Sequence, residues 1–118
     1  MAEQATEHEL EPQRVSELQD AQFVDVRTPD EYETSHIEGS LHIPLEELQE
    51  AAAELDRDRP VVFYCRSGDR SAMAVDAFRA SGWDAYAING GLVAWAAEGL
   101  PLEPEGAEVA HHSGLPPA

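Results

Sequence analysis

The sequence predicts an α/β fold in three layers, with a small, mostly parallel central sheet of about five strands flanked by helices. Two observations predict it. Short apolar runs alternate along the chain with segments of helical periodicity, and the links between them are short. Such alternation is typical of parallel strands joined by right-handed crossovers. With 118 residues, 42% of them hydrophobic, the chain can build one core and hardly more.

The first elements are a short edge strand, a helix and a buried strand. Residues 8–10 are the expected edge strand. Pro12 suits a first helical turn, and Val15 and Leu18 then fall on one face, which predicts a short helix. The run Gln-Phe-Val-Asp-Val at 22–26 is apolar enough to predict a strand covered on both faces.

The middle of the chain combines short elements with one longer helix. Residues 30–34 follow a proline and predict a single helical turn, and 40–43 predict a short strand that Pro44 ends. An amphipathic helix with glutamate-rich solvent positions is expected next. Its apolar face consists of Leu45, Leu48, Ala52 and Leu55.

The last elements repeat the strand-helix alternation. Val-Val-Phe-Tyr at 61–64 is the strongest strand signal in the chain. A helix is predicted over about 71–80, ended by Gly82, because glycine commonly follows a helix C-terminus. A strand at 83–88 and a helix at 92–97 complete the unit.

Composition limits the possible partners. Acidic residues number 24 against 7 basic ones, all of them arginine, and the net charge is −17. Such a charge opposes binding to nucleic acid and to anionic membranes. No signal peptide or apolar membrane span is visible, and the single cysteine excludes a disulfide framework, so a cytoplasmic location is expected. The absence of lysine indicates a GC-rich bacterial genome.

The ends of the chain differ from its middle. Residues 1–6 carry no pattern and are expected to be a flexible N-terminus. Residues 102–118 are rich in Pro, Gly and Glu, which predicts a disordered tail, since such a composition buries too little apolar area to offset its ordering entropy. The folded domain is therefore predicted over 7–101.

The chemistry is expected at Cys65, which directly follows the strand at 61–64. A strand, a tight loop and a helix N-terminus together aim backbone N–H groups at an anion, and Gly68 gives the loop the freedom to close. The helix terminus and neighbouring arginines lower a thiol pKa, which makes Cys65 a candidate nucleophile rather than a buried apolar cysteine. The candidate loop residues are Arg66, Ser67, Gly68, Asp69 and Arg70.

This loop, Cys-Arg-Ser-Gly-Asp-Arg-Ser from Cys65, resembles the active-site loop of the rhodanese sulfurtransferases. Three further stretches of the sequence resemble motifs of the same family: Asp25-Val26-Arg27, Glu31-Tyr32 followed by His36 to Pro44, and Gly90-Gly91 with Trp95, Gly99 and Pro101. The second stretch departs from the family pattern at four positions: Ser35, Glu38, Ser40 and His42. The resemblance implies a rhodanese domain over about residues 7–101.

The resemblance also implies a two-step reaction through a Cys65 persulfide. A sulfane sulfur would pass from thiosulfate or a persulfide donor to cyanide or a thiol acceptor, with no cofactor. A persulfide carrier that docks on a partner enzyme in a sulfur relay remains an alternative. A phosphatase or arsenate reductase is disfavoured, because phosphatases of related architecture have one residue more between Cys and Arg than the four found here.

The remaining polar candidates are expected to be structural. A strand-end carboxylate followed by arginine suits an ion pair, so Asp25 and Arg27 are predicted to support the loop. Arg70 either attracts the donor anion or braces the loop through Asp25 or another carboxylate. His36 and His42 lack further ligands at suitable spacing, and the adjacent His111 and His112 lie in the predicted tail, so no metal site is expected.

Overall fold

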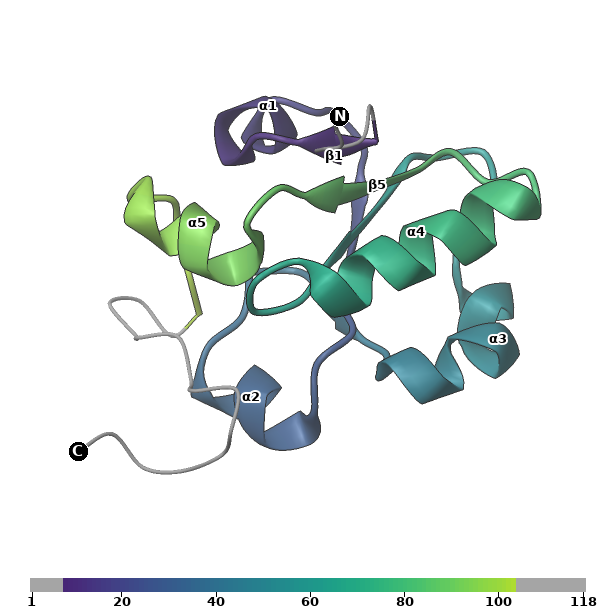
Figure 1. Cartoon of the computed structure of the whole chain (residues 1–118), viewed down its shortest axis with the longest axis horizontal. Helices are drawn as coiled ribbons and strands as arrows, with labels where there is room; N and C mark the ends of the chain where they lie inside the picture. The colour runs from purple at the N-terminus through teal and green to yellow at the C-terminus, as the bar shows by residue number, and fades with distance from the viewer. Residues whose placement is uncertain (1–7, 104–118) are drawn as a thin grey trace.

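Five parallel strands form one sheet in the order β1-β5-β4-β2-β3 (Figure 1). The computed structural model describes residues 8–103. Every pair of neighbouring strands is parallel, so the predicted fold class is confirmed. The strands are β1 (Glu9–Leu10), β2 (Gln22–Asp25), β3 (Leu41–His42), β4 (Val61–Tyr64) and β5 (Ala85–Ile88).

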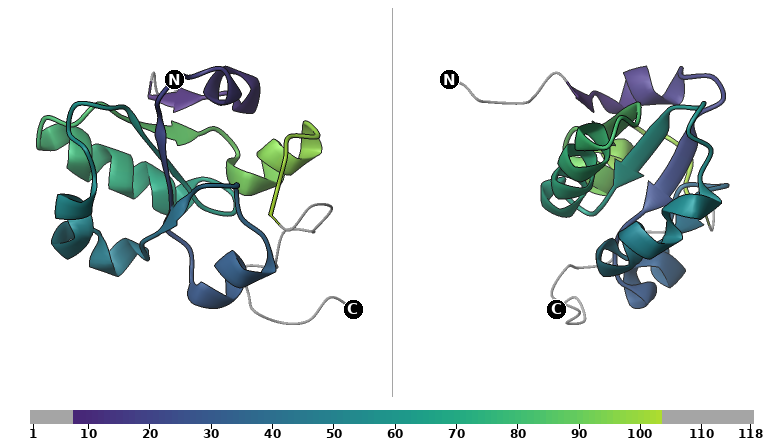
Figure 2. Two further views of the ribbon diagram at one scale, coloured as in Figure 1. Left: turned by 180° about the vertical axis from the view of Figure 1, so that it is seen from behind. Right: turned by 90° about the vertical axis from the view of Figure 1, so that its right-hand side faces the viewer.

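Helices connect these strands and cover both faces of the sheet. In the views of Figures 1 and 2, α1 and β1 lie at one end of the molecule and α2 lies at the other. The helical segments are α1 (Pro12–Ser16), α2 (Pro29–Thr34), η1 (Leu45–Glu47), α3 (Leu48–Ala51), η2 (Ala52–Glu54), α4 (Asp69–Ala80) and α5 (Gly91–Ala97).

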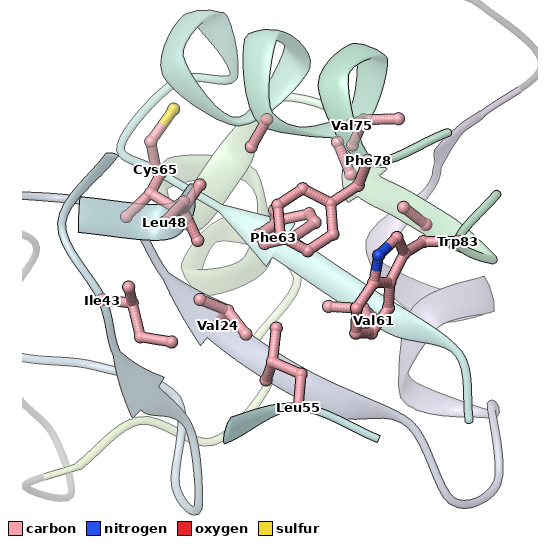
Figure 3. Close-up of a cluster of buried hydrophobic side chains, with 14 residues drawn as sticks. Val24, Ile43, Leu48, Leu55, Val61, Phe63, Cys65, Val75, Phe78 and Trp83 are labelled. Carbon is pink, nitrogen blue, oxygen red and sulfur yellow. The ribbon is translucent and has the colours of Figure 1, made fainter. Parts of the chain in front are cut away.

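Two apolar clusters fill the space between the layers. On one face, β2, β4 and β5 pack against α4 and the η1-α3-η2 segment (Figure 3). On the other face, Val62 and Tyr64 of β4 pack against Val15 of α1 and Leu92 and Trp95 of α5. Strand β4 is buried at every position, which follows from its place in the middle of a sheet covered on both sides.

The single amphipathic helix predicted for 45–55 was wrong in form, because the segment divides into η1, α3 and η2. The predicted apolar face is nevertheless kept, because Leu45, Leu48, Ala52 and Leu55 all pack on the same cluster.

The described part of the chain continues two residues past the predicted domain end at Pro101. Leu102 packs against the second apolar cluster, and Glu103 exchanges two backbone hydrogen bonds with His36 (2.9 and 2.7 Å). The remainder of the predicted tail and the predicted N-terminal segment at 1–6 lie outside the described residues, so the division into domains stays a prediction.

Candidate active site

The loop after β4 bends back so that a backbone amide meets the cysteine sulfur. The N–H of Gly68 donates to Cys65 Sγ at 3.0 Å. Gly68 has φ +120°, a conformation that strains any residue with a Cβ, and it immediately precedes α4. The sulfur therefore lies at the N-terminal end of a 12-residue helix, which is the positive end of the helix dipole.

Cys65 is nevertheless buried, with 1% of the residue exposed. Cys65 belongs to the apolar cluster, and Figure 3 shows its sulfur directed towards the start of α4 and away from Val24 and Phe63. The sulfur is thus sheltered from solvent but supplied with a hydrogen-bond donor. A cysteine that served only as apolar filling would need no such donor.

The structure adds Ser71, which the sequence analysis did not single out. Its hydroxyl lies 3.6 Å from Cys65 Sγ and donates to the carbonyl of Gly68 at 3.1 Å. Ser71 is fully buried in the first turn of α4. Ser71 therefore links the sulfur to the loop backbone. Its position in the sequence, six residues after the cysteine at the junction of loop and helix, could have indicated this residue.

The other predicted loop residues differ in exposure. Ser67 and Asp69 are exposed, and Arg66 is half-buried. Arg70 is also half-buried and forms a bidentate ion pair with Glu31 of α2, at 2.9 and 3.2 Å. The bracing carboxylate is therefore Glu31, because Asp25 is paired elsewhere.

The pair between Arg70 and Glu31 couples α2 to the loop electrostatically. Burial by itself would raise the pKa of Glu31, but hydrogen bonds from Arg70 and from Thr28 outweigh it and lower that pKa to about 2. The pKa of Arg70 is raised, first by its hydrogen bonds to Glu31. A carboxylate held this way stays ionised and keeps Arg70 fixed against the loop.

The lowered pKa makes stability depend on pH. Ionised Glu31 stabilises the fold at every pH above its unfolded value near 4.5, and this contribution disappears as the pH falls towards 2. We expect Glu31→Gln to lower the free energy of unfolding by about 3 kcal/mol at pH 7 and by almost nothing at pH 2. Urea unfolding of both proteins across this range measures the difference.

Glu33→Gln is the matched control, since Glu33 is exposed on the same helix. Its difference from the parent protein should stay small at every pH. A loss that is the same at pH 2 and pH 7 in Glu31→Gln would mean that the ion pair is not its source.

Asp25 and Arg27 form the expected ion pair at the end of β2. Both are fully buried, and Arg27 binds both carboxylate oxygens of Asp25, with its Nη2 at 2.6 Å from Oδ2. Arg27 also donates to the carbonyl of Ser35. Asp25 is paired in register with Tyr64, the residue before Cys65, so the ion pair lies at the same edge of the sheet as the sulfur. Its predicted role in supporting the loop stays a prediction.

Helix α5 also holds the loop, through backbone hydrogen bonds. The N–H of Leu92 donates to the carbonyl of Cys65 at 2.8 Å, and that of Val93 to the carbonyl of Arg66 at 3.0 Å. Gly91 permits this approach: a Cβ at this position would stand 2.5 Å from the Arg66 oxygen, and its φ is +65°. The Gly90-Gly91 pair therefore shapes the loop. This role is not visible in the sequence, because the pair lies far from Cys65 along the chain.

The two histidines of the predicted second stretch contact Tyr32. The rings of His36 and His42 both stack on the ring of Tyr32, with centroid distances of 3.9 and 4.7 Å. Within residues 8–103, no group of three or more His, Cys, Asp or Glu side chains is placed to hold a metal ion. His111 and His112 lie outside the described residues. None of the helices in the described part has the length and apolarity needed to cross a membrane.

The fold and the loop together define an α/β domain that carries one cysteine at the end of its central strand, with the amide of Gly68 donating to its sulfur. Residues 11–98 match the Rhodanese-like domain family. The chain belongs to this family, which confirms the resemblance inferred from its motifs.

Individual relatives cover much of the chain. A sulfurtransferase of Allochromatium vinosum is 38% identical over 96 residues, which are 80% of this chain and 90% of that protein. Thiosulfate sulfurtransferase GlpE of Pseudomonas aeruginosa is 35% identical over 73% of this chain and 81% of its own length. An HTH-type transcriptional regulator of Mycobacterium tuberculosis is 41% identical over 83% of this chain, but the chain spans only 44% of that regulator.

Solved structures agree with the fold. A rhodanese-related protein from Thermoplasma volcanium superimposes with a TM-score of 0.78 and 31% identity, covering 83% of this chain and 99% of the other. The match spans nearly the whole of the solved chain, so the similarity concerns a complete domain rather than a shared supersecondary motif.

Proposed function

We propose that this chain is a sulfurtransferase that carries a sulfane sulfur on Cys65, taking it from thiosulfate or a persulfide donor and passing it to a nucleophilic acceptor such as cyanide or a thiol. The observation that carries the proposal is the 3.0 Å hydrogen bond from the Gly68 amide to Cys65 Sγ. Membership of the rhodanese-like family and the sulfurtransferases among the relatives support sulfur transfer as the general activity.

The reaction runs in two balanced steps. The Cys65 thiolate attacks the outer sulfur of thiosulfate, a new S–S bond forms, and sulfite leaves with the electron pair of the old S–S bond. The product is a Cys65 persulfide whose negative terminal sulfur accepts hydrogen bonds from the loop amides. The acceptor then attacks that terminal sulfur, and the thiolate of Cys65 leaves unchanged. Neither step needs a cofactor.

Direct sulfur loading tests the proposal. Purified protein incubated with thiosulfate is expected to gain the mass of one sulfur atom, to lose it on addition of cyanide, and to release thiocyanate in equal amount. The same experiment with an aryl phosphate in place of thiosulfate should give no turnover. Release of phosphate without sulfur loading would contradict the proposal in favour of a phosphatase.

A persulfide carrier is the second candidate, and the 1% exposure of Cys65 favours it, because such shelter protects a loaded sulfur between two encounters. A carrier would accept sulfur from a protein or glutathione persulfide quickly, yet turn over thiosulfate negligibly. Comparing the two loading rates separates a carrier from an enzyme. Both readings place the reaction in a reducing, cytoplasmic setting, where the thiol stays free.

The two loop arginines are expected to contribute unequally. Arg70→Ala should slow thiosulfate loading about tenfold or more, because it removes a positive charge near the sulfur and also releases the loop from Glu31. Arg66→Ala should slow it only a few-fold. Stopped loading reactions analysed by mass spectrometry give both rates, and equal, small effects would contradict this assignment of Arg70.

A further inference from the structure

A groove of about 940 Å³ lies between α4 and the η1-α3-η2 segment. Its lining is apolar except for Gln49, Arg57 and Ser81. The apolar lining includes Leu45, Leu48, Met73 and Phe78. A concave apolar surface with a few polar groups is typical of sites for small organic ligands, whose pockets measure about 300 to 1,000 Å³. The groove is therefore large enough for such a ligand.

Arg57 is the only charged residue among the described residues that line this groove. Two contacts fix its guanidinium: Nη2 donates to the carbonyl of Ser81 at 2.7 Å, and Cζ lies 4.7 Å from the ring centroid of Trp83. Gly82 leaves room for this arrangement, since a Cβ there would stand 3.1 Å from Arg57 Nη2. Although Arg57 is exposed, its charged end is thus held at the groove instead of extending into solvent.

Part of the hydrogen-bonding capacity of this guanidinium is unused within the described part of the chain. There, no hydrogen bond or ion pair joins Nε or Nη1 of Arg57 to another residue. A guanidinium carries its N–H donors in a planar fork that matches the two oxygens of a carboxylate. Because Trp83 and the Ser81 carbonyl fix the position of the fork, Arg57 is arranged in advance to bind a planar anion.

The charge balance favours an anion with a single negative charge. The described lining offers one guanidinium, and the chain as a whole has a net charge of −17. A phosphate dianion would bring a second charge that the lining does not neutralise and that the acidic chain repels. A neutral apolar ligand would cover the N–H donors of Arg57 without accepting a hydrogen bond from them. An apolar monoanion meets both conditions.

We propose that this groove binds an alkyl carboxylate, with the carboxylate on Arg57 and the alkyl chain between α4 and the η1-α3-η2 segment. Met73, Ala77 and Ser81 line the groove at intervals of four residues along α4 and its C-cap, so they follow one face of the helix. The helix rises by about 12 Å from Met73 to Ser81, the length of an extended chain of about eight to ten carbon atoms.

The carboxylate end of such a ligand would lie away from the sulfur loop. Figure 3 shows Cys65 and Trp83, the ring beside Arg57, at opposite ends of the buried cluster. The inference does not depend on sulfur transfer, because it rests on the groove and on Arg57, and its test measures binding alone. Cys65→Ser should therefore bind the carboxylate as tightly as the parent chain does.

Octanoate, octan-1-ol and butanoate separate the two parts of the proposal. Calorimetric titration of the full chain at physiological salt, which screens the remaining acidic surface, measures each affinity. Octanoate is expected to bind. Octan-1-ol has the same chain without the charge and should bind about tenfold more weakly or worse, because the hydrogen bonds to a charged group are lost. Butanoate keeps the charge but lacks four methylene groups, so it too should bind at least about tenfold more weakly.

Two variants test the two ends of the proposed site. Arg57→Gln should weaken octanoate about tenfold and leave octan-1-ol unchanged, because only the charged ligand uses the guanidinium. Ala77→Glu brings a carboxylate into the groove and should weaken octanoate about tenfold or more. Arg14→Gln and Ala97→Glu are the matched controls, since both residues are exposed and lie on α1 and α5, which cover the other face of the sheet. Both controls should bind octanoate within about twofold of the parent chain.

Several results would contradict the proposal. Equal affinity for octanoate and octan-1-ol, or undiminished octanoate binding by Arg57→Gln, would show that the groove holds apolar compounds without using its charge. No binding of octanoate to the parent chain would overturn the proposal directly, and this comparison of ligands needs no variant. Thermal melting checks that the variants fold. A dimer in sedimentation equilibrium that Ala77→Glu separates would mean that a second copy covers the groove, which would also rule out the carboxylate site.

Discussion

Cys65→Ser is expected to abolish sulfur loading and thiocyanate formation, lowering the rate by about a thousandfold or more. Serine keeps nearly the same shape beside Gly68 and Ser71, so the loop remains closed. Its hydroxyl, however, has a far higher pKa than a thiol, and it can form no persulfide. The measurements are the mass of the protein after incubation with thiosulfate and the rate of thiocyanate release with cyanide present.

Ser67→Ala is a suitable control for this experiment, because Ser67 is an exposed side chain of the same loop, and the variant should load sulfur at close to the parent rate. Thermal melting should place both variants within a few degrees of the parent protein. Full sulfur loading of Cys65→Ser would remove the thiol from the mechanism and with it the proposed function.

Gly91→Ala is expected to have the largest effect of any substitution outside the loop. An alanine Cβ would stand 2.5 Å from the Arg66 oxygen and 2.6 Å from the Cys65 oxygen, and the φ of +65° is itself unfavourable for alanine. Strain and overpacking together should lower the free energy of unfolding by about 2 to 4 kcal/mol. The displaced carbonyls should also slow sulfur loading, because the loop amides shift with them.

Gly99→Ala separates these two causes. Gly99 has a similar φ of +77°, but a Cβ there would meet nothing within 4 Å. It should lose only about 1 kcal/mol of stability and retain loading. Urea unfolding and loading rates for both variants make the comparison, and equal losses at the two positions would show that backbone strain alone, rather than contact with the loop, limits position 91.

Local features of the site could be predicted from sequence, because each depends on neighbouring residues. The strand at 61–64, the glycine in the loop and the helix after it are contiguous, and together they place Cys65 at an amide. Parallel pairing also followed from the alternation of elements, without knowledge of any particular contact.

Contacts between distant segments could not be predicted in the same way. Glu31 reaches Arg70 across 39 residues of sequence, and nothing in either segment selects it over the many other carboxylates of the chain. The closeness of Gly91 to the Arg66 carbonyl depends equally on how α5 docks on the sheet. Only the assembled fold reveals which of many acidic residues and glycines the loop requires.

The 1% exposure of Cys65 has a consequence for the selection of reagents by size. A small anion that presents one terminal atom can meet the sulfur after a slight movement of the loop, whereas a bulky alkylating agent needs a wide opening. Peroxide reaction to sulfinic acid, which is irreversible for most cysteines, requires repeated access and is slowed by the same cover. We therefore expect a cysteine with so little exposure to be durable as well as selective.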